Sequence, residues 1–197
     1  MYTEEQHLRK AGFPLVAGVD EAGRGPLAGP VVVAAVMFPA QYKHSQINDS
    51  KQLSRMDRER LFVDITHNAL SYATVMMSAK KIDTMGILNA TKLAMRQAVL
   101  KLDPQPDFVL TDAVALNLMN LPQKAIVKGD ATVFSIAAAS ILAKVTRDRF
   151  MMKQAKKFPE YGFEEHMGYG TKVHLKAIEK HGACKLHRMS FKPFKGV

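Results

Sequence analysis

The chain has 197 residues, 47% of them apolar and 23% charged, a composition typical of one soluble globular domain rather than a fibrous or disordered protein. Lys and Arg outnumber Asp and Glu by 28 to 18, and the resulting net charge of +10 indicates a polyanionic partner such as nucleic acid. No apolar run approaches the roughly 18 residues of a membrane span, and the polar N-terminus does not resemble a signal peptide, so we expect a cytoplasmic protein outside the membrane. The single cysteine, Cys184, excludes an internal disulfide and fits a reducing compartment.

The positive charge is concentrated toward the C-terminus. Residues 1–140 contain 15 basic and 13 acidic side chains, whereas residues 141–197 contain 13 basic and 5 acidic ones. A basic C-terminal quarter on a nearly neutral body is typical of a nucleic-acid contact surface. Charge alone leaves a merely solubilising surface open as the alternative.

The first half of the chain predicts three strands with helices after the second and third. Apolar or β-branched runs bounded by turn residues place these strands at 15–20, 30–39 and 71–78. Ser54 followed by Asp57 is a capping pattern that predicts a helix over 55–69. Asp83 can cap a second helix, which runs to about Leu102 before two prolines stop it.

The second half predicts two more strands, at 107–112 and 123–128, and helices over 132–157 and from Thr171 to about Gly182. Three strands followed by alternating helices and strands indicate an α/β fold, a mixed five-stranded sheet flanked by helices. We expect one domain over residues 1–197, of which about 158–197 form a basic helical C-terminal extension.

Four acidic residues stand at or near the ends of apolar runs: Asp20, Glu21, Asp112 and Asp130. Strand ends that meet at one edge of a sheet would form a cluster of carboxylate oxygens, which hard cations such as Mg²⁺ and Mn²⁺ prefer. Because neighbouring strand residues point to opposite faces, Asp20 and Glu21 can share one site only if the strand ends or bulges there. Asp112 could instead be a solvated strand-end acid, and Asp130 could be a helix N-cap.

Gly23, Arg24 and Gly25 follow the first two acids directly. Glycine lets a bulky partner approach the backbone closely, and the arginine can form a forked contact with a phosphate. This is not a dinucleotide-binding loop, because the glycine spacing is one residue too long and a strand follows instead of a helix. An ordinary Gly/Pro turn with two solvated acids is the alternative.

The segment DEAGRGPLAGP at 20–30 resembles the signature of ribonuclease HII, the type 2 ribonuclease H. Further blocks of resemblance follow in the same order and span nearly the whole chain: DSK at 49–51, ILNAT at 87–91, KGDA at 128–131, SIAAASILAKVTRD at 135–148, GYGT at 168–171, and His174.

The resemblance implies an RNase H-like fold and a site in which Asp20, Glu21, Asp112 and Asp130 bind two divalent metal ions, Mg²⁺ or Mn²⁺. It implies hydrolysis of the RNA strand of RNA·DNA hybrids and cutting 5′ to a single ribonucleotide in duplex DNA, leaving a 3′-hydroxyl and a 5′-phosphate. By the same resemblance, Gly23, Arg24 and Gly25 sense the 2′-hydroxyl, and Tyr169 stacks under the sugar at the RNA–DNA junction.

Other residues have weaker indications. Lys51 and Lys144 could contact phosphate or the site carboxylates, with an ordinary surface role as the alternative. His174 could form a hydrogen bond near the substrate or simply stabilise its helix, and we expect Asp148 to be an ion-pair partner.

The sequence departs from the family pattern at two positions. Ala113 stands where the family often has glycine, and we expect no loss of activity from it. Met167 stands where the family commonly has lysine, so one phosphate contact would be missing.

Two rival interpretations stay open from sequence. One is another enzyme of the same fold, such as a junction resolvase or a type 1 ribonuclease H, against which the Gly23–Gly25 loop and Tyr169 weigh. The other is a non-catalytic basic nucleic-acid-binding protein, in which four strand-end carboxylates would repel phosphate unless a metal lies between them. We expect a monomer.

Overall fold

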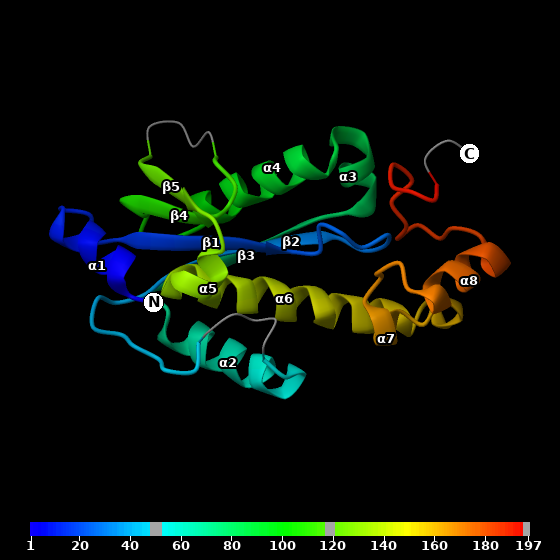
Figure 1. Cartoon of the computed structure of the whole chain (residues 1–197), viewed down its shortest axis with the longest axis horizontal. Helices are drawn as coiled ribbons and strands as arrows, with labels where there is room; N and C mark the ends of the chain where they lie inside the picture. Colours follow the sequence, from blue (N-terminus) through cyan, green and yellow to red (C-terminus); the bar gives the residue numbers. More distant parts are fainter. Residues whose placement is uncertain (48–52, 117–120, 195–197) are drawn as a thin grey trace.

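The structure, a computed structural model, describes residues 1–47, 53–116 and 121–194. Its centre is one five-stranded sheet with the strand order β3-β2-β1-β4-β5 (Figure 1). The strands are β1 (Val16–Ala22), β2 (Val31–Met37), β3 (Ser71–Met77), β4 (Phe108–Asp112) and β5 (Gln123–Ile126). The first three pair antiparallel, and β1, β4 and β5 pair parallel. The predicted mixed five-stranded sheet is therefore confirmed.

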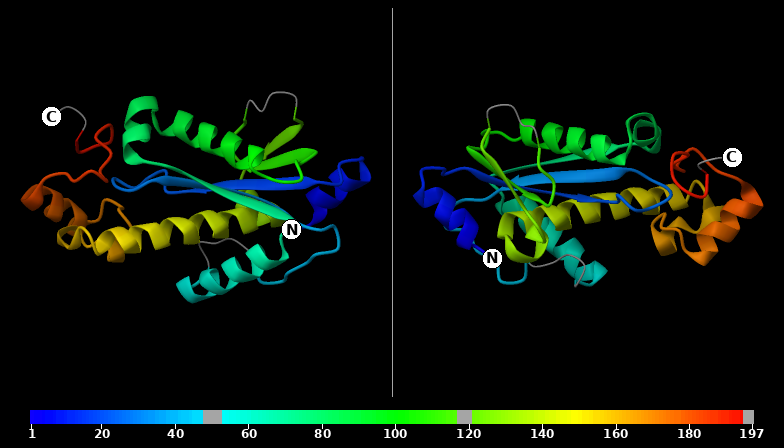
Figure 2. Two further views of the ribbon diagram at one scale, coloured as in Figure 1. Left: turned by 180° about the vertical axis from the view of Figure 1, so that it is seen from behind. Right: turned by 45° about the horizontal axis from the view of Figure 1, so that its top comes forward.

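Helices cover both faces of this sheet (Figures 1 and 2). They are α1 (Thr3–Lys10), α2 (Arg55–Asn68), α3 (Ala79–Met85), α4 (Ile87–Leu100), α5 (Gly129–Thr132), α6 (Phe134–Ala155), α7 (Phe163–His166) and α8 (Lys172–His181), with a 3₁₀ turn at Pro159–Tyr161. Helix α4 packs on one face, α6 packs on the other, and α2 packs on α6. No helix within the described ranges has the length and apolar character that a membrane crossing requires.

Each face of the sheet has its own apolar core, and the C-terminal segments have a third. Alternation along β1 turns Ala17 and Val19 toward α4, where they join a cluster with Met95. The opposite face meets the alanine-rich side of α6. Beyond the sheet, α7 and α8 lie beside the far end of α6 (Figure 1), and Phe163 there packs in a separate cluster.

The single helix predicted from Asp83 to Leu102 is wrong, because the chain forms two helices there. Gly86 separates them with a φ of +78°, a conformation that glycine adopts without strain. Asp83 lies inside α3 rather than at its start, and the helix is capped by Ser78. The Asp83 carboxylate instead accepts a hydrogen bond of 3.0 Å from the backbone N–H of Met189, in the C-terminal tail.

The helix predicted over 132–157 is also divided. Val133 has an extended backbone, with φ −120° and ψ 124°, which separates the single turn of α5 from the long helix α6. The Thr171 cap and the stop at Gly182 are confirmed for α8. The Ser54 cap, with its hydroxyl accepting from the Asp57 N–H, is confirmed for α2.

Helix α1, which was not predicted from the sequence, binds the start of α6 through a buried carboxylate. Its Glu5 is buried, and one carboxylate oxygen accepts hydrogen bonds of 2.9 Å from both the N–H and the hydroxyl of Ser135. These groups lie in the first turn of α6, where unpaired N–H groups and the helix dipole favour a negative charge. Helix α1 thus fixes the start of α6.

Gly18 lets α6 approach β1 very closely. A Cβ atom at Gly18 would lie 2.2 Å from the carbonyl carbon of Ser135, a distance that real contacts do not allow. The contact holds the start of α6 against the first half of β1, and the short α5 lies directly before it in the chain. The position of α5, and with it that of Asp130, therefore depends on Gly18.

We expect Gly18→Ala to destabilise the fold by about 3 kcal/mol or more, because a methyl group there must push α6 away from β1. The matched control is Gly12→Ala, where no atom lies within 4 Å and only the strain of a positive φ is added, about 1 kcal/mol. Urea unfolding followed by circular dichroism measures both values. Equal values for the two variants would contradict the role of Gly18.

Candidate active site

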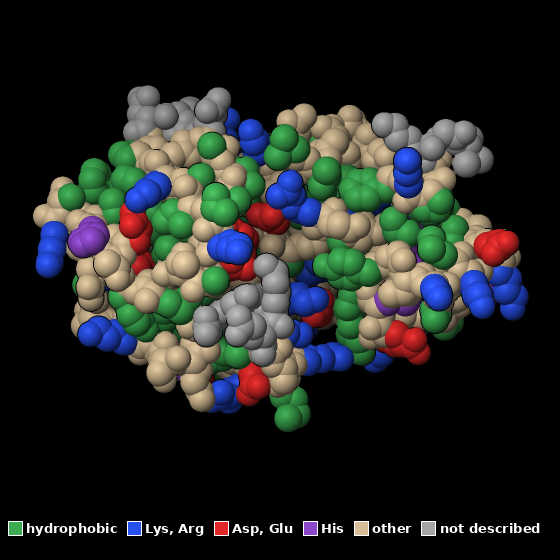
Figure 3. Space-filling model, viewed as in Figure 1, with side chains coloured by type: hydrophobic (Ala, Val, Ile, Leu, Met, Phe, Trp, Pro, Cys, Tyr) green, Lys and Arg blue, Asp and Glu red, His purple; other side chains and the backbone are tan. Residues whose placement is uncertain are grey.

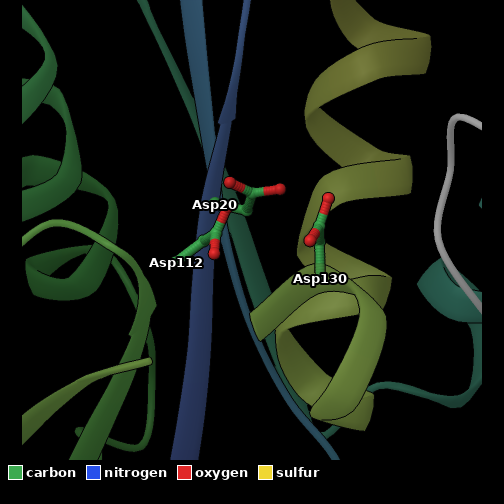
Figure 4. A group of neighbouring side chains, drawn as sticks. All are labelled: Asp20, Asp112 and Asp130. Carbon is green, nitrogen blue, oxygen red and sulfur yellow. The ribbon is translucent and has the colours of Figure 1, made fainter. Parts of the chain in front are cut away.

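The parallel pairing of β1 and β4 brings two aspartates to the same edge of the sheet. Val19 of β1 stands opposite Thr111 of β4, and the next residues along each strand are Asp20 and Asp112. Asp130 comes from α5, which lies against the end of β4. One carboxylate oxygen from each of the three lies within 4.8 Å of the others (Figure 4).

The turn before α5 is attached to the site through Asp112. Its Oδ1 atom accepts a hydrogen bond of 2.8 Å from the N–H of Gly129. A Cβ atom at Gly129 would lie 2.6 Å from Cδ1 of Ile136, so a larger residue would force the turn away. Asp130 lies within α5, and the caps of α5 and α6 are other residues, so the alternative that Asp130 is an N-cap is wrong.

Asp20 has a strongly perturbed environment. Its side chain is buried, and burial raises its pKa well above the ordinary value; the neighbouring charge of Glu21, and less strongly that of Asp112, raise the pKa further. The Glu21 N–H, 2.7 Å from Oδ1, and the Ser140 hydroxyl favour the ionised form. A cation placed among these carboxylates would relieve both the burial cost and the repulsion.

The donor set fits a hard divalent cation. Three carboxylates supply only oxygen atoms, as Mg²⁺ and Mn²⁺ prefer, and Mg²⁺ typically takes a few carboxylates together with substrate phosphate oxygens. Asp20 and Asp130 are buried, whereas Asp112 is partly exposed, so the group is open on one side.

Glu21 does not belong to this group of three. Strand β1 continues in regular pairing with β2 through Glu21, which stands opposite Val33, so the expected strand end or bulge is absent at that point. The Glu21 carboxylate lies 3.3 Å from the guanidinium of Arg24 and faces a neighbouring pocket. It is still close enough to Asp20 to raise the pKa of that carboxyl.

The pocket beside the aspartates has a volume of about 270 Å³. It is lined by residues from β1, α2, α6 and the segment before α8: Glu21, Ala22, Gly23, Arg58, Ser140, Lys144 and Tyr169. Figure 3 shows a hollow on this face of the molecule, with acidic and basic side chains on its borders. A phosphate-containing ligand in the pocket would thus lie between cationic side chains and the carboxylates.

Gly25 and Tyr169 face each other although they are far apart in the sequence. A Cβ atom at Gly25 would lie 3.9 Å from Cε1 of the Tyr169 ring, which is an ordinary contact distance. The ring is 45% exposed and therefore available to a ligand. The structure thus places the Gly23–Gly25 loop beside the tyrosine that the resemblance paired with it.

Of the two predicted lysines only Lys144 can be placed, and Ser140 and Arg58 line the pocket with it. Lys144 lines the pocket and lies 2.9 Å from Asp148, the predicted ion-pair partner, whereas Lys51 falls outside the described residues. Sequence analysis missed Ser140, although its position one helical turn before Lys144 puts both on the same face. It also missed Arg58, which nothing in the sequence distinguishes from its basic neighbours on α2.

Tyr169 is fixed through its backbone by two histidines. Its N–H donates to the carbonyl of His166, and its carbonyl lies 2.8 Å from Nδ1 of His174. Burial, together with a smaller effect of the nearby rings of His166 and His187, lowers the pKa of His174 from 6.5 to about 4. His174 is therefore neutral at physiological pH and acts on the tyrosine backbone, beyond stabilising its helix.

Both departures from the family pattern occupy left-handed backbone. Ala113 has a φ of +51°, which explains why glycine suits the position and why alanine costs about 1 kcal/mol there. Met167 has a φ of +52°, and its carbonyl accepts a hydrogen bond of 2.9 Å from Arg147.

Comparison with known proteins agrees with the family resemblance of these residues. A model of the family described as ribonuclease HII matches residues 17–194. Ribonuclease HII of Ruminiclostridium cellulolyticum is 52% identical over 191 residues, which cover 97% of this chain and 75% of that protein. Ribonuclease HII of a Geobacillus species is 53% identical over 191 residues, or 97% and 69% of the two chains.

Solved structures agree with these sequence matches. Ribonuclease H2 from Pyrococcus horikoshii superposes with a TM-score of 0.79 at 27% identity, over 91% of this chain and 95% of the other. Ribonuclease HII in a complex with PCNA from Archaeoglobus fulgidus gives 0.76 at 26% identity, over 90% and 95%. Bst-RNase HIII, in a complex with Mn²⁺, gives 0.74 at 18% identity over 92% and 68%, which shows a shared fold.

We expect Asp20→Asn to separate stability from metal binding. Without divalent ions the variant should gain about 1 kcal/mol of unfolding free energy, because a buried and repelled carboxylate is removed. It should lose most of the Mg²⁺-dependent rise in melting temperature, which for the wild type corresponds to about 2.7 kcal/mol when Mg²⁺ is present at 100 times its Kd. Asp103→Asn, at an exposed acid outside the site, should keep the full Mg²⁺ effect. An unchanged Mg²⁺ effect in Asp20→Asn would exclude Asp20 as a ligand.

We expect the fold to lose stability as the pH falls from about 6.5 to about 4. In this window the unfolded chain protonates His174 while the folded chain keeps it neutral, so protons favour unfolding. The unfolding free energy of His174→Gln should fall less steeply over the same window. Urea titrations at several pH values measure both slopes, and parallel slopes would show that His174 does not carry the effect.

Proposed function

The chain belongs to the ribonuclease HII family, and on that premise we propose how its site selects and cuts the substrate. Membership makes it an endonuclease that cleaves RNA in RNA·DNA hybrids, and it excludes both the type 1 enzyme and the non-catalytic binding protein. The proposal is that the enzyme also cuts 5′ to a single ribonucleotide embedded in duplex DNA. The products are a 3′-hydroxyl and a 5′-phosphate.

The observation that carries the proposal is the placement of the Gly23–Gly25 loop against Tyr169, beside the aspartates. The 2′-hydroxyl is the group that distinguishes RNA from DNA, and it both donates and accepts hydrogen bonds. A loop whose glycines have no side chain lets the sugar approach the backbone closely enough for such bonds. The Tyr169 ring then lies under the next sugar, where a further hydroxyl would be crowded.

We propose that Asp20, Glu21, Asp112 and Asp130 hold two divalent ions, Mg²⁺ or Mn²⁺. When bound, such ions activate a water molecule and stabilise the leaving 3′-oxygen. The clustering of the three aspartates supports this, and Glu21, which follows Asp20 and lines the neighbouring pocket, is the proposed fourth ligand, reaching the ions from the pocket side.

The basic residues of the pocket hold the phosphodiester. Arg58 and Lys144 line it from two different helices, and Arg24 stands beside Glu21. Guanidinium and ammonium groups form charge-assisted hydrogen bonds with phosphate and so fix the backbone of the cut strand. Lys51 is proposed for the same role from the sequence alone.

We further propose that one copy of the chain acts alone in the cytoplasm. The aspartates, the pocket and Tyr169 all come from a single chain, so no second copy is required to complete the site. Residues 1–197 then act as one nuclease domain, to which the extension from about 158 to 197 contributes Tyr169.

A DNA duplex with one internal ribonucleotide tests the proposal. We expect a single cut on its 5′ side in the presence of Mg²⁺ or Mn²⁺, mapped at nucleotide resolution. The cut should be absent with EDTA, with an all-DNA duplex, and in Asp112→Asn. If that duplex stays intact while a long RNA·DNA hybrid is cut, junction recognition by the loop and Tyr169 is wrong.

A further inference from the structure

Residues 184–188 are connected to two parts of the pocket lining. They contact the Gly23–Gly25 loop directly and the Tyr169 segment through His174. This segment forms a bridge to the chain just after the Gly23–Gly25 loop, where Ala28 pairs with His187. The Gly29 N–H donates to the Leu186 carbonyl, and the Arg188 N–H donates to the Leu27 carbonyl, both at 2.8 Å. The segment is therefore attached to the backbone that leads out of the loop.

Arg188 binds the Gly23–Gly25 loop directly. The side chain is fully buried, and its guanidinium donates hydrogen bonds to three backbone carbonyls: Gly23 at 2.6 Å, Arg24 at 2.9 Å and Gly29 at 3.0 Å. Burial, with a contribution from Arg147, lowers its pKa to about 9, so it is still charged at neutral pH. Charge-assisted bonds to three carbonyls in a buried place fix the loop conformation firmly.

His187 acts on the other side of the pocket through a second histidine. Its ring Nδ1 lies 2.9 Å from the backbone N of Cys184 and 3.3 Å from the Cys184 carbonyl oxygen, and the shorter contact requires Nδ1 to accept from the Cys184 N–H. Neutral His187 therefore has its proton on Nε2, which lies 3.1 Å from Nε2 of His174. His174 must accept there and donate from Nδ1 to the Tyr169 carbonyl, 2.8 Å away.

The segment after the Gly23–Gly25 loop and the segment containing Tyr169 also contact each other through their backbones. The N–H groups of Leu27 and Ala28 both donate to the Gly168 carbonyl, at 2.9 and 3.2 Å. A Cβ atom at Gly168 would lie 2.4 Å from the Ala28 carbonyl oxygen, so the two backbones are in close contact. Residues 27–29 thus lie between the Tyr169 segment and the 184–188 segment.

We propose that His187 and Arg188 are positioning residues that together set the spacing between the Gly23–Gly25 loop and Tyr169, and thereby the preference for a ribonucleotide next to deoxyribonucleotides. This inference rests on the proposed function of those two elements. Two adjacent residues of one segment each control one side of the pocket, Arg188 the loop and His187 the tyrosine. A 2′-hydroxyl sensor and a sugar-stacking ring discriminate only when both contact neighbouring nucleotides at once, so their spacing determines selectivity.

The test compares cleavage of two substrates, a duplex with one ribonucleotide and a long RNA·DNA hybrid. In the hybrid no deoxyribose follows the ribonucleotide, so the spacing to Tyr169 contributes less. We expect His187→Ala and Arg188→Lys each to lower kcat/KM for the single-ribonucleotide duplex about tenfold to 100-fold, the scale of a small misplacement, and to lower hybrid cleavage much less. Tyr169→Ala should give the same pattern, and His187→Gln, which keeps an N–H donor, should restore most of the loss in His187→Ala.

Met95→Ala is the matched control, because it removes a fully buried side chain from the core between α4 and the sheet. It should lower stability but leave the ratio of the two substrates unchanged. If His187→Ala and Arg188→Lys also leave the ratio unchanged, their role is structural only and the inference is wrong.

Hydrogen exchange gives a readout that does not depend on cleavage. His187→Ala should speed exchange about tenfold in the peptide containing Tyr169, and Arg188→Lys should do so in residues 23–29, with β1 and β2 unaffected. If the wild type fails to cut the single-ribonucleotide duplex, the proposed function is wrong, and exchange still decides whether these residues hold the two sides. Unchanged exchange in both peptides overturns the inference whatever the cleavage result.

Discussion

The close contact of α6 with β1 at Gly18 is the constraint on which the rest of the site depends. It fixes the start of α6, and the short α5 just before it lies against the end of β4, so that Asp130 meets Asp20 and Asp112 from a helix. Helix α6 then continues past Ser140 and Lys144 to Arg147. The Arg147 guanidinium donates to the Pro30 carbonyl on one side of the pocket and to the Met167 carbonyl on the other. Helix α6 therefore determines the positions of the clustered aspartates, the pocket wall and the loops on either side of the pocket relative to one another.

Hydrophobic pattern and turn residues predicted most of the fold, because strand and helix periods depend on local sequence. The strands, the Ser54 and Thr171 caps and the mixed sheet followed from such local features. The break at Gly86 and the extended Val133 were missed, since the apolar pattern continues through both positions. Helix α1 was missed because its buried Glu5 is stabilised by a partner 130 residues further along the chain.

The candidate site was predicted only where local sequence features or the family resemblance indicated its residues. Asp20 and Asp112 were predicted from the ends of apolar runs, and Tyr169 only from the family resemblance. The sequence gives no sign that Arg188 is buried among carbonyls or that His187 is linked to Tyr169 through His174, because such contacts need the folded backbone. Charged residues in a basic tail look solvated in sequence, yet two buried arginines, Arg147 and Arg188, are bonded to carbonyl oxygens here.

The location of residues 184–188 has a consequence for synthesis of the chain. The ribosome makes a protein from its N-terminus, and domains fold as their segments emerge. All three clustered aspartates have been translated by residue 130, whereas residues 184–188, which contact the Gly23–Gly25 loop directly and Tyr169 through His174, are made later. A nascent chain thus contains the three clustered aspartates before it contains the residues that hold the Gly23–Gly25 loop and Tyr169, so the carboxylate cluster can form while the pocket beside it still lacks its support.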